Sequence, residues 1–141
     1  MRFNYFEFPN KANPQGPRIL VPLIVIRLSY AGKHKDLYAL IDSGADACLF
    51  HSSVAKVLGI DYKSGRQESF GGVSGHEISA FFHTVRLTVR GLSSVDLEVG
   101  FTESPGVRSG LLGQRGLFDQ YQIRFERYKN TIELFPKSVG S

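Results

Sequence analysis

The chain has 141 residues, of which 42% are hydrophobic and 21% charged, and this fits one globular domain rather than two domains or a disordered segment. The formal net charge of +4 comes from lysines and arginines scattered from Arg2 to Lys137, without the basic stripe of a nucleic-acid-binding surface. The longest apolar stretch, Ile19 to Ile26, is too short to span a bilayer and contains Pro22, so we expect neither a nucleic-acid partner nor a membrane partner.

The cysteine content and the first residues bear on location. The one cysteine, Cys48, cannot form an intramolecular disulfide and suits a reducing compartment. We expect it to be a small buried hydrophobic residue. Met1 to Phe8 is aromatic and polar, without the basic start and aliphatic core of a secretory signal peptide. Together these features favour a cytoplasmic location.

Residues 1–18 are predicted to form an extended arm with an aromatic start and a linker rich in proline and asparagine. Its aromatic residues and prolines are Phe3, Tyr5, Phe6, Phe8, Pro9, Pro14 and Pro17. We assign residues 19–136 to the folded domain and residues 137–141 to a C-terminal tail. Since Tyr5-Phe6 is an apolar pair on a flexible segment, we hypothesise that it lies in a substrate groove and is trimmed there.

Two strands are predicted after the arm. Arg18 to Tyr30 is rich in isoleucine and valine, and Pro22 within it indicates an edge or a bulge. Ala31 to His34 then turns the chain. Leu37 to Ile41 forms the second strand, which ends directly at Asp42.

A short structural helix is predicted from His51 to Gly59. Ser52 or Ser53 is expected to cap its start, and Gly59 to end it. The residues expected on its inner face are Val54, Val57 and Leu58.

The next segments read as two strand pairs. Gln67 to Ala80 is typical of a hairpin whose tip, Gly71 to Gly75, permits positive φ angles and leaves backbone amides uncovered. Apolar and polar residues alternate from Phe82 to Arg90 and again from Val95 to Val99. This alternation predicts a half-buried antiparallel pair.

The C-terminal part predicts a buried strand at Leu111-Leu112, a brief helix from Gln114 to Gln120 and a last hairpin. The hairpin strands are Tyr121 to Tyr128 and Asn130 to Phe135, and we expect this amphipathic hairpin to supply much of a dimer interface. Many short strands, with 15 glycines and 11 phenylalanines, favour an all-β, closed architecture with one or two short helices.

The candidate chemistry lies where the second strand ends. Asp42 follows an apolar run, and an ionised carboxylate there is costly to bury without hydrogen-bond donors. The Ser43 hydroxyl and the sharp turn that Gly44 permits can supply such donors. Of the 13 acidic residues, Asp42 alone has this setting.

Asp42-Ser43-Gly44-Ala45 after an apolar strand resembles the active-site motif of the retropepsin-like (retroviral-type) aspartic proteases. Two further segments appear in the order that this family expects: the glycine-rich hairpin at Gly71 to Gly75, and Leu111-Leu112-Gly113 before a short helix. The resemblance extends from Ile19 to Phe135. It implies a retropepsin-like closed β-barrel, the single acid-protease lobe.

The resemblance also implies an aspartic endopeptidase that cleaves extended polypeptides, with apolar residues preferred beside the bond. Water is the nucleophile, so no cofactor and no metal is expected. Two carboxylates that share one proton supply both the base and the acid. Because the chain holds a single Asp-Ser-Gly, the second carboxylate must be the partner subunit's Asp42, and we expect a homodimer.

The resemblance assigns roles to individual residues. Asp42 is the catalytic acid, the Ser43 hydroxyl crosses to the partner and braces the pair, and the Gly44 carbonyl binds substrate. The residues expected to bind substrate are Ala45, Asp46, Gly71, Gly72, Val73, Ser74, Gly75 and Leu112. The hairpin tip is expected to close as a flap, with Val73 touching the peptide and Leu112 packing beneath the Asp42 loop.

One position departs from the family pattern. Family members often have an arginine directly after the glycine that corresponds to Gly113, whereas here Gln114 follows and Arg115 comes one residue later. The usual ion pair to the Asp46 position is therefore not assured, and Asp46 can equally be a charged turn residue.

Other functions remain alternatives. The main one is a noncatalytic dimeric peptide-binding module on the same fold, because a fold and a motif do not guarantee turnover. A basic barrel that binds nucleic acid predicts steep salt dependence, but the clustered arginines and aromatic platform are absent. The four histidines show no metal-ligand spacing, and Gly110, Gly113 and Gly116 do not match a phosphate-binding loop.

Overall fold

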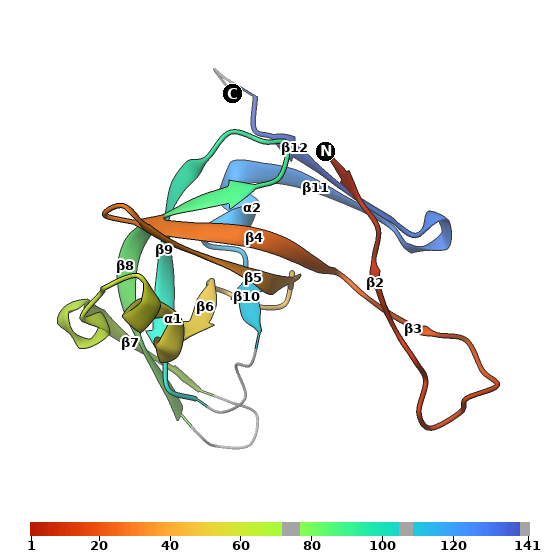
Figure 1. Cartoon of the computed structure of the whole chain (residues 1–141), viewed down its shortest axis with the longest axis horizontal. Coiled ribbons are helices and arrows are strands. Elements are labelled where there is room, and N and C mark those ends of the chain that lie inside the picture. The colour runs from red at the N-terminus through yellow and green to blue at the C-terminus, as the bar shows by residue number, and fades with distance from the viewer. Residues whose placement is uncertain (72–76, 105–108, 139–141) are drawn as a thin grey trace.

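A computed structural model of the chain describes residues 1–71, 77–104 and 109–138. The fold is mostly β, with the two short helices α1 (Ser52–Val57) and α2 (Leu117–Gln120), in agreement with the all-β class predicted from the sequence (Figure 1). Within these residues, neither helix is long and apolar enough to cross a membrane.

Hydrogen bonds join six strands into a closed ring, because β4 pairs with β5 on one side and with β8 on the other. In ring order the strands are β4 (Leu23–Tyr30), β5 (Lys33–Ile41), β10 (Gly110–Leu112), β6 (Leu49–His51), β9 (Val95–Thr102) and β8 (Glu77–Val89). A further strand, β7 (Arg66–Gly71), pairs with β8 and forms the predicted hairpin with it. The strands predicted around residues 18–30, 37–41, 82–90, 95–99 and 111–112 are confirmed.

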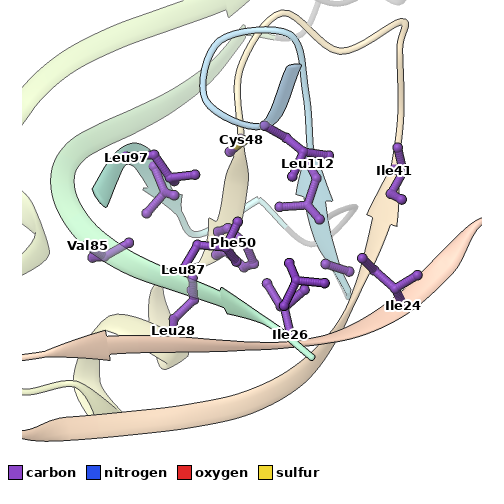
Figure 2. Close-up of a cluster of buried hydrophobic side chains, with 14 of the residues drawn as sticks. Ile24, Ile26, Leu28, Ile41, Cys48, Phe50, Val85, Leu87, Leu97 and Leu112 are labelled. Carbon is purple, nitrogen blue, oxygen red and sulfur yellow. The ribbon is translucent and has the colours of Figure 1, made fainter. Parts of the chain in front are cut away.

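The core fills the inside of the ring, and alternation along each strand decides which side chains enter it (Figure 2). Ile24, Ile26 and Leu28 of β4 point inward and are at most 3% exposed, whereas Val25 between them is 48% exposed. Val85 and Leu87 of the neighbouring strand β8 belong to the same cluster, and Leu87 lies directly opposite Leu28 in the ladder. Each such side chain contributes roughly 1.5–3 kcal/mol by leaving water.

Proline and glycine set the ends of the elements as expected. Pro22 separates β4 from the short strand β3 (Ile19–Val21), and Gly59, with a φ of 73°, follows α1 in a conformation that a β-carbon disfavours. The predicted N-cap was wrong by one residue. His51 caps α1, because its Nδ1 accepts the Ser53 N–H at 3.1 Å. The predicted inner face was also partly wrong, since Val57 is exposed.

The C-terminal hairpin forms as predicted. Strands β11 (Tyr121–Glu126) and β12 (Thr131–Pro136) are antiparallel, and the short 3-10 turn η2 (Arg127–Lys129) connects them through Asn130, whose φ is 55°. A second 3-10 turn, η1 (Tyr62–Ser64), precedes β7.

The first residues are strands rather than a free arm. β1 (Arg2–Phe3) pairs with β12, and β2 (Phe6–Phe8) pairs with β3 in a hairpin that extends away from the ring (Figure 1). Tyr5 between them is only 8% exposed, and its N–H donates to Asn130 Oδ1 at 3.0 Å. Tyr5 is thus held in the domain, and trimming at Tyr5-Phe6, which requires these residues to detach, stays a prediction.

Candidate active site

Asp42 stands at the point where β5 leaves the sheet. β10 lies between β5 and β6 and runs parallel to β5, with Leu112 opposite Ile41. The Asp42 N–H donates to the Leu112 carbonyl at 3.0 Å, and the Ile41 N–H donates to the Pro22 carbonyl at 2.9 Å. The main chain on both sides of the carboxylate is therefore fixed by neighbouring strands.

The residues after Asp42 form a tight turn around its carboxylate. The Ala45 N–H donates to the Asp42 carbonyl at 3.1 Å, and the Gly44 N–H donates to Asp42 Oδ1 at 2.9 Å. The Asp42 side chain is half-buried, whereas Ser43 and Gly44 are exposed. One carboxylate oxygen thus accepts a main-chain bond at the surface of the subunit, as the sequence predicted for a donor-lined carboxylate.

The segment after β10 holds this turn from below. The Gln114 N–H donates to the Ala45 carbonyl at 2.8 Å, the Arg115 N–H donates to the Asp46 carbonyl at 2.8 Å, and Gln114 Nε2 donates to the Ser43 carbonyl at 2.8 Å. Sequence reasoning missed this role of Gln114. Its position directly after Gly113 was the available signal.

Gly113 is required here by close approach. A β-carbon on it would lie 2.4 Å from the Ala47 carbonyl oxygen and 2.6 Å from the Ala45 carbonyl oxygen, which is shorter than van der Waals contact allows. The backbones of the two loops can therefore meet only if this residue has no side chain.

Cys48 fills the space beneath the same contact. Its side chain is fully buried, the Gly113 N–H donates to its Sγ at 3.4 Å, and its thiol donates to the Arg115 carbonyl at 3.4 Å. Burial raises the pKa of the Cys48 thiol, so it stays protonated. The prediction of a small buried residue is confirmed.

The ion pair that the sequence left in doubt is present. Arg115 Nε lies 3.2 Å from Asp46 Oδ2, although the arginine stands one residue later than the family pattern expects. The same guanidinium donates to both carboxylate oxygens of Glu68 on β7, at 3.0 and 3.3 Å. Hydrogen bonds from Arg115 and Arg66 hold the pKa of Glu68 below its usual range.

The structure describes only the first residue of the predicted hairpin tip. Gly71 is the exposed last residue of β7 and pairs with Glu77, so the strands that lead to the hairpin tip are confirmed. Gly72, Val73, Ser74 and Gly75 lie outside the described residues, and their contact with a peptide stays a prediction.

Leu112 packs beneath the Asp42 loop, as the sequence analysis expected, and its side chain is fully buried. Leu112 bonds to the loop through its main-chain carbonyl, which accepts the Asp42 N–H, and not through its side chain. The assignment of Leu112 as a substrate contact therefore does not hold in the single subunit, because a fully buried side chain cannot touch a peptide.

The arrangement offers one surface carboxylate on a rigid turn. Among the residues that the structure describes, no group of three or more histidine, cysteine, aspartate or glutamate side chains is placed to hold a metal ion. A single carboxylate can act as a base or as an acid, but not as both in one step, so the site becomes chemically complete only with a second acid facing Asp42.

Comparisons with known proteins agree with this geometry. A family model described as aspartyl protease matches residues 26–115, which include Asp42, β7 and Arg115. Among solved structures, the chain resembles a retropepsin-like aspartic protease from Rickettsia conorii with a TM-score of 0.59 and 15% identity, over 86% of this chain and 100% of that chain. It also resembles the EIAV protease in complex with the inhibitor HBY-793, with a TM-score of 0.50 and 21% identity, over 67% of this chain and 82% of that chain. At these identities the two structures establish a retropepsin-like fold. A search of the curated proteins found no match.

Proposed function

The chain belongs to the aspartyl protease family, and we propose that it is an aspartic endopeptidase whose active form is a symmetric homodimer. The observation that carries this proposal is the position of Asp42. Its carboxylate stands at the end of β5, on a turn fixed by main-chain bonds and bordered by exposed residues, so an identical turn can approach it about a twofold axis.

In such a dimer the two Asp42 carboxylates share one proton, because two like charges a few ångströms apart do not both ionise easily. The ionised carboxylate takes a proton from water as the water oxygen attacks the peptide carbonyl carbon. The protonated carboxyl gives its proton to the carbonyl oxygen. When the tetrahedral diol breaks down, a proton passes to the leaving nitrogen, the C–N bond breaks, and the shared proton is restored.

The neighbouring residues support this step. Ser43 is exposed beside the carboxylate, where its hydroxyl can reach the partner subunit and brace the pair. The Gly44 carbonyl and the main chain of Asp46 border the site and can hydrogen-bond to an extended peptide. Ala45 can contact the peptide through its side chain, because its main-chain N–H and carbonyl already bond to Asp42 and Gln114. Such a peptide adds as a strand between the turn and the β7–β8 hairpin.

We further propose that the β11–β12 hairpin contributes to the dimer interface. Phe125 is 40% exposed and Tyr128 is 82% exposed on this hairpin, so it offers large side chains that a partner subunit can cover.

The test compares wild type with Asp42→Asn on a library of extended peptides from acidic to neutral pH. We expect wild type to cleave peptides that contain apolar pairs, and we expect the variant to lose at least about a thousandfold in kcat, because the amide cannot take a proton from water. If wild type binds library peptides but cleaves none, the chain is instead a peptide-binding module on this fold.

A further inference from the structure

An alternating chain of charges links the Asp42 loop to the hairpin. In order it runs through Asp46, Arg115, Glu68, Arg66 and Glu98. Asp46 belongs to the loop, Glu68 and Arg66 to β7, and Glu98 to β9. Segments distant in sequence are therefore joined between the Asp42 loop and the β7–β8 hairpin.

Arg115 is the connecting residue of this chain. Its Nε faces Asp46 at 3.2 Å, while Nη1 and Nη2 grip the two oxygens of Glu68 at 3.3 and 3.0 Å. The guanidinium also lies over the Phe82 ring, with 5.4 Å between its carbon and the ring centroid. A planar fork held on both edges and against an aromatic face has little rotational freedom.

Glu68 is held more firmly than the outer members of the chain. Its side chain is 27% exposed, against 49% for Glu98, and Arg66 Nη2 also donates to its Oε2 at 2.8 Å. In the β7–β8 ladder, Glu68 lies opposite Ala80, three residues before the exposed end of β7 at Gly71. The contact between Glu68 and Arg115 therefore sets the distance between the β7–β8 hairpin and the Asp42 loop.

We infer that Glu68, acting through Arg115, is a positioning residue that fixes β7 against the Asp42 loop, so that the hairpin and Asp46 present their main-chain groups to the two sides of one peptide strand. This inference rests on the proposed function for its consequence in catalysis. The tether itself is a property of the fold.

The expected kinetic signature follows from what the tether touches. It does not contact Asp42, so the proton transfers are unchanged when it is broken. Without the tether, the substrate itself has to align the Asp42 loop with the β7–β8 hairpin. This alignment costs part of the free energy of substrate binding. KM is expected to rise about three- to tenfold while kcat changes less than about twofold.

The experiment compares Glu68→Gln with Glu98→Gln. Glu98 accepts two bonds from Arg66 at 3.1 and 3.2 Å and does not pair with Arg115, so the control removes one charge from the same network but leaves the tether intact. We expect the rise in KM for Glu68→Gln only. Equal KM values for the two variants, or a fall in kcat without a change in KM, would overturn the inference.

Hydrogen exchange separates failure of the tether from failure of the proposed function. In Glu68→Gln the amides of residues 66–71 are expected to exchange faster by about threefold or more, and in Glu98→Gln to remain as in wild type. If wild type shows no peptidase activity, the proposed function fails but the exchange result still decides the tether. Unchanged exchange in Glu68→Gln excludes the tether whatever the activity. If Glu68→Gln folds poorly, Glu68→Asp, whose side chain is too short to reach both arginines, replaces it.

Discussion

The Asp42 loop and the β2–β3 hairpin both adjoin Pro22, which follows β3 and accepts the Ile41 N–H at 2.9 Å, yet they are built in opposite ways. Three main-chain bonds and one side-chain amide bond fix residues 42–46 to β10 and to the segment that follows it. The hairpin has one short ladder and contacts between rings, such as Phe6 with Phe8 at 4.8 Å and Phe6 with Tyr38 at 5.5 Å. Phe8 and Ile19 remain 40% and 48% exposed.

This difference between the loop and the hairpin indicates where the fold tolerates substitutions. Main-chain bonds and contacts without a β-carbon allow little adjustment, so the Asp42 carboxylate is held in a single geometry, as the proposed dimer requires. The hairpin depends on exposed aromatic side chains, which adjust easily and contribute little free energy unless another surface covers them. Substitutions should therefore have large effects near residue 113 and small ones near residue 8.

The strongest test of this contrast is Gly113→Ala. The new β-carbon would meet the Ala47 and Ala45 carbonyl oxygens, so we expect the free energy of unfolding to fall by more than about 3 kcal/mol. Chemical denaturation measures this. Gly71→Ala is the matched control, because nothing lies within 4 Å of its β-carbon, and a loss there as large as at Gly113 would contradict the account.

A second test compares a buried with an exposed residue among the N-terminal strands. Tyr5 is buried against the core, so Tyr5→Ala is expected to lower the free energy of unfolding by about 2–3 kcal/mol. Phe8→Ala should stay within about 0.5 kcal/mol of wild type, because Phe8 is exposed. Similar losses at both positions, measured by thermal or urea unfolding, would show that the hairpin belongs to the core after all.

The smallest effect concerns the ion pairs that join loop and hairpin. The pKa of Glu68 is lowered in the folded state from an ordinary value of 4.5, so its charge stabilises the fold above that pH, and this contribution disappears as pH falls through the lowered pKa. Glu68→Gln should therefore be less stable than wild type at pH 7, by less than about 1 kcal/mol because the network is partly exposed. The gap should narrow as the pH falls below 4.5 and Glu68 of wild type takes up its proton, and a gap that widens on acidification would contradict the assignment.

The sequence predicted those features whose cause is local. The apolar run of β4, the alternation in β8 and β9, the break at Pro22 and the Asp42 motif each depend on residues a few positions apart. The pairing of β1 with β12 and the bond from Arg115 to Glu68 join residues far apart in the chain, and no local pattern encodes them. His51 was missed as a cap because serine is the commoner choice.

The central claim is that one catalytic centre needs two copies of Asp42, and mixing experiments test it most directly. Wild type and Asp42→Asn are unfolded together, refolded at constant total concentration and assayed for peptide cleavage. If both carboxylates are required, activity falls with the square of the wild-type fraction, to about one quarter in an equal mixture. Activity that falls in simple proportion, to about one half, would show that each subunit works alone and would contradict the account.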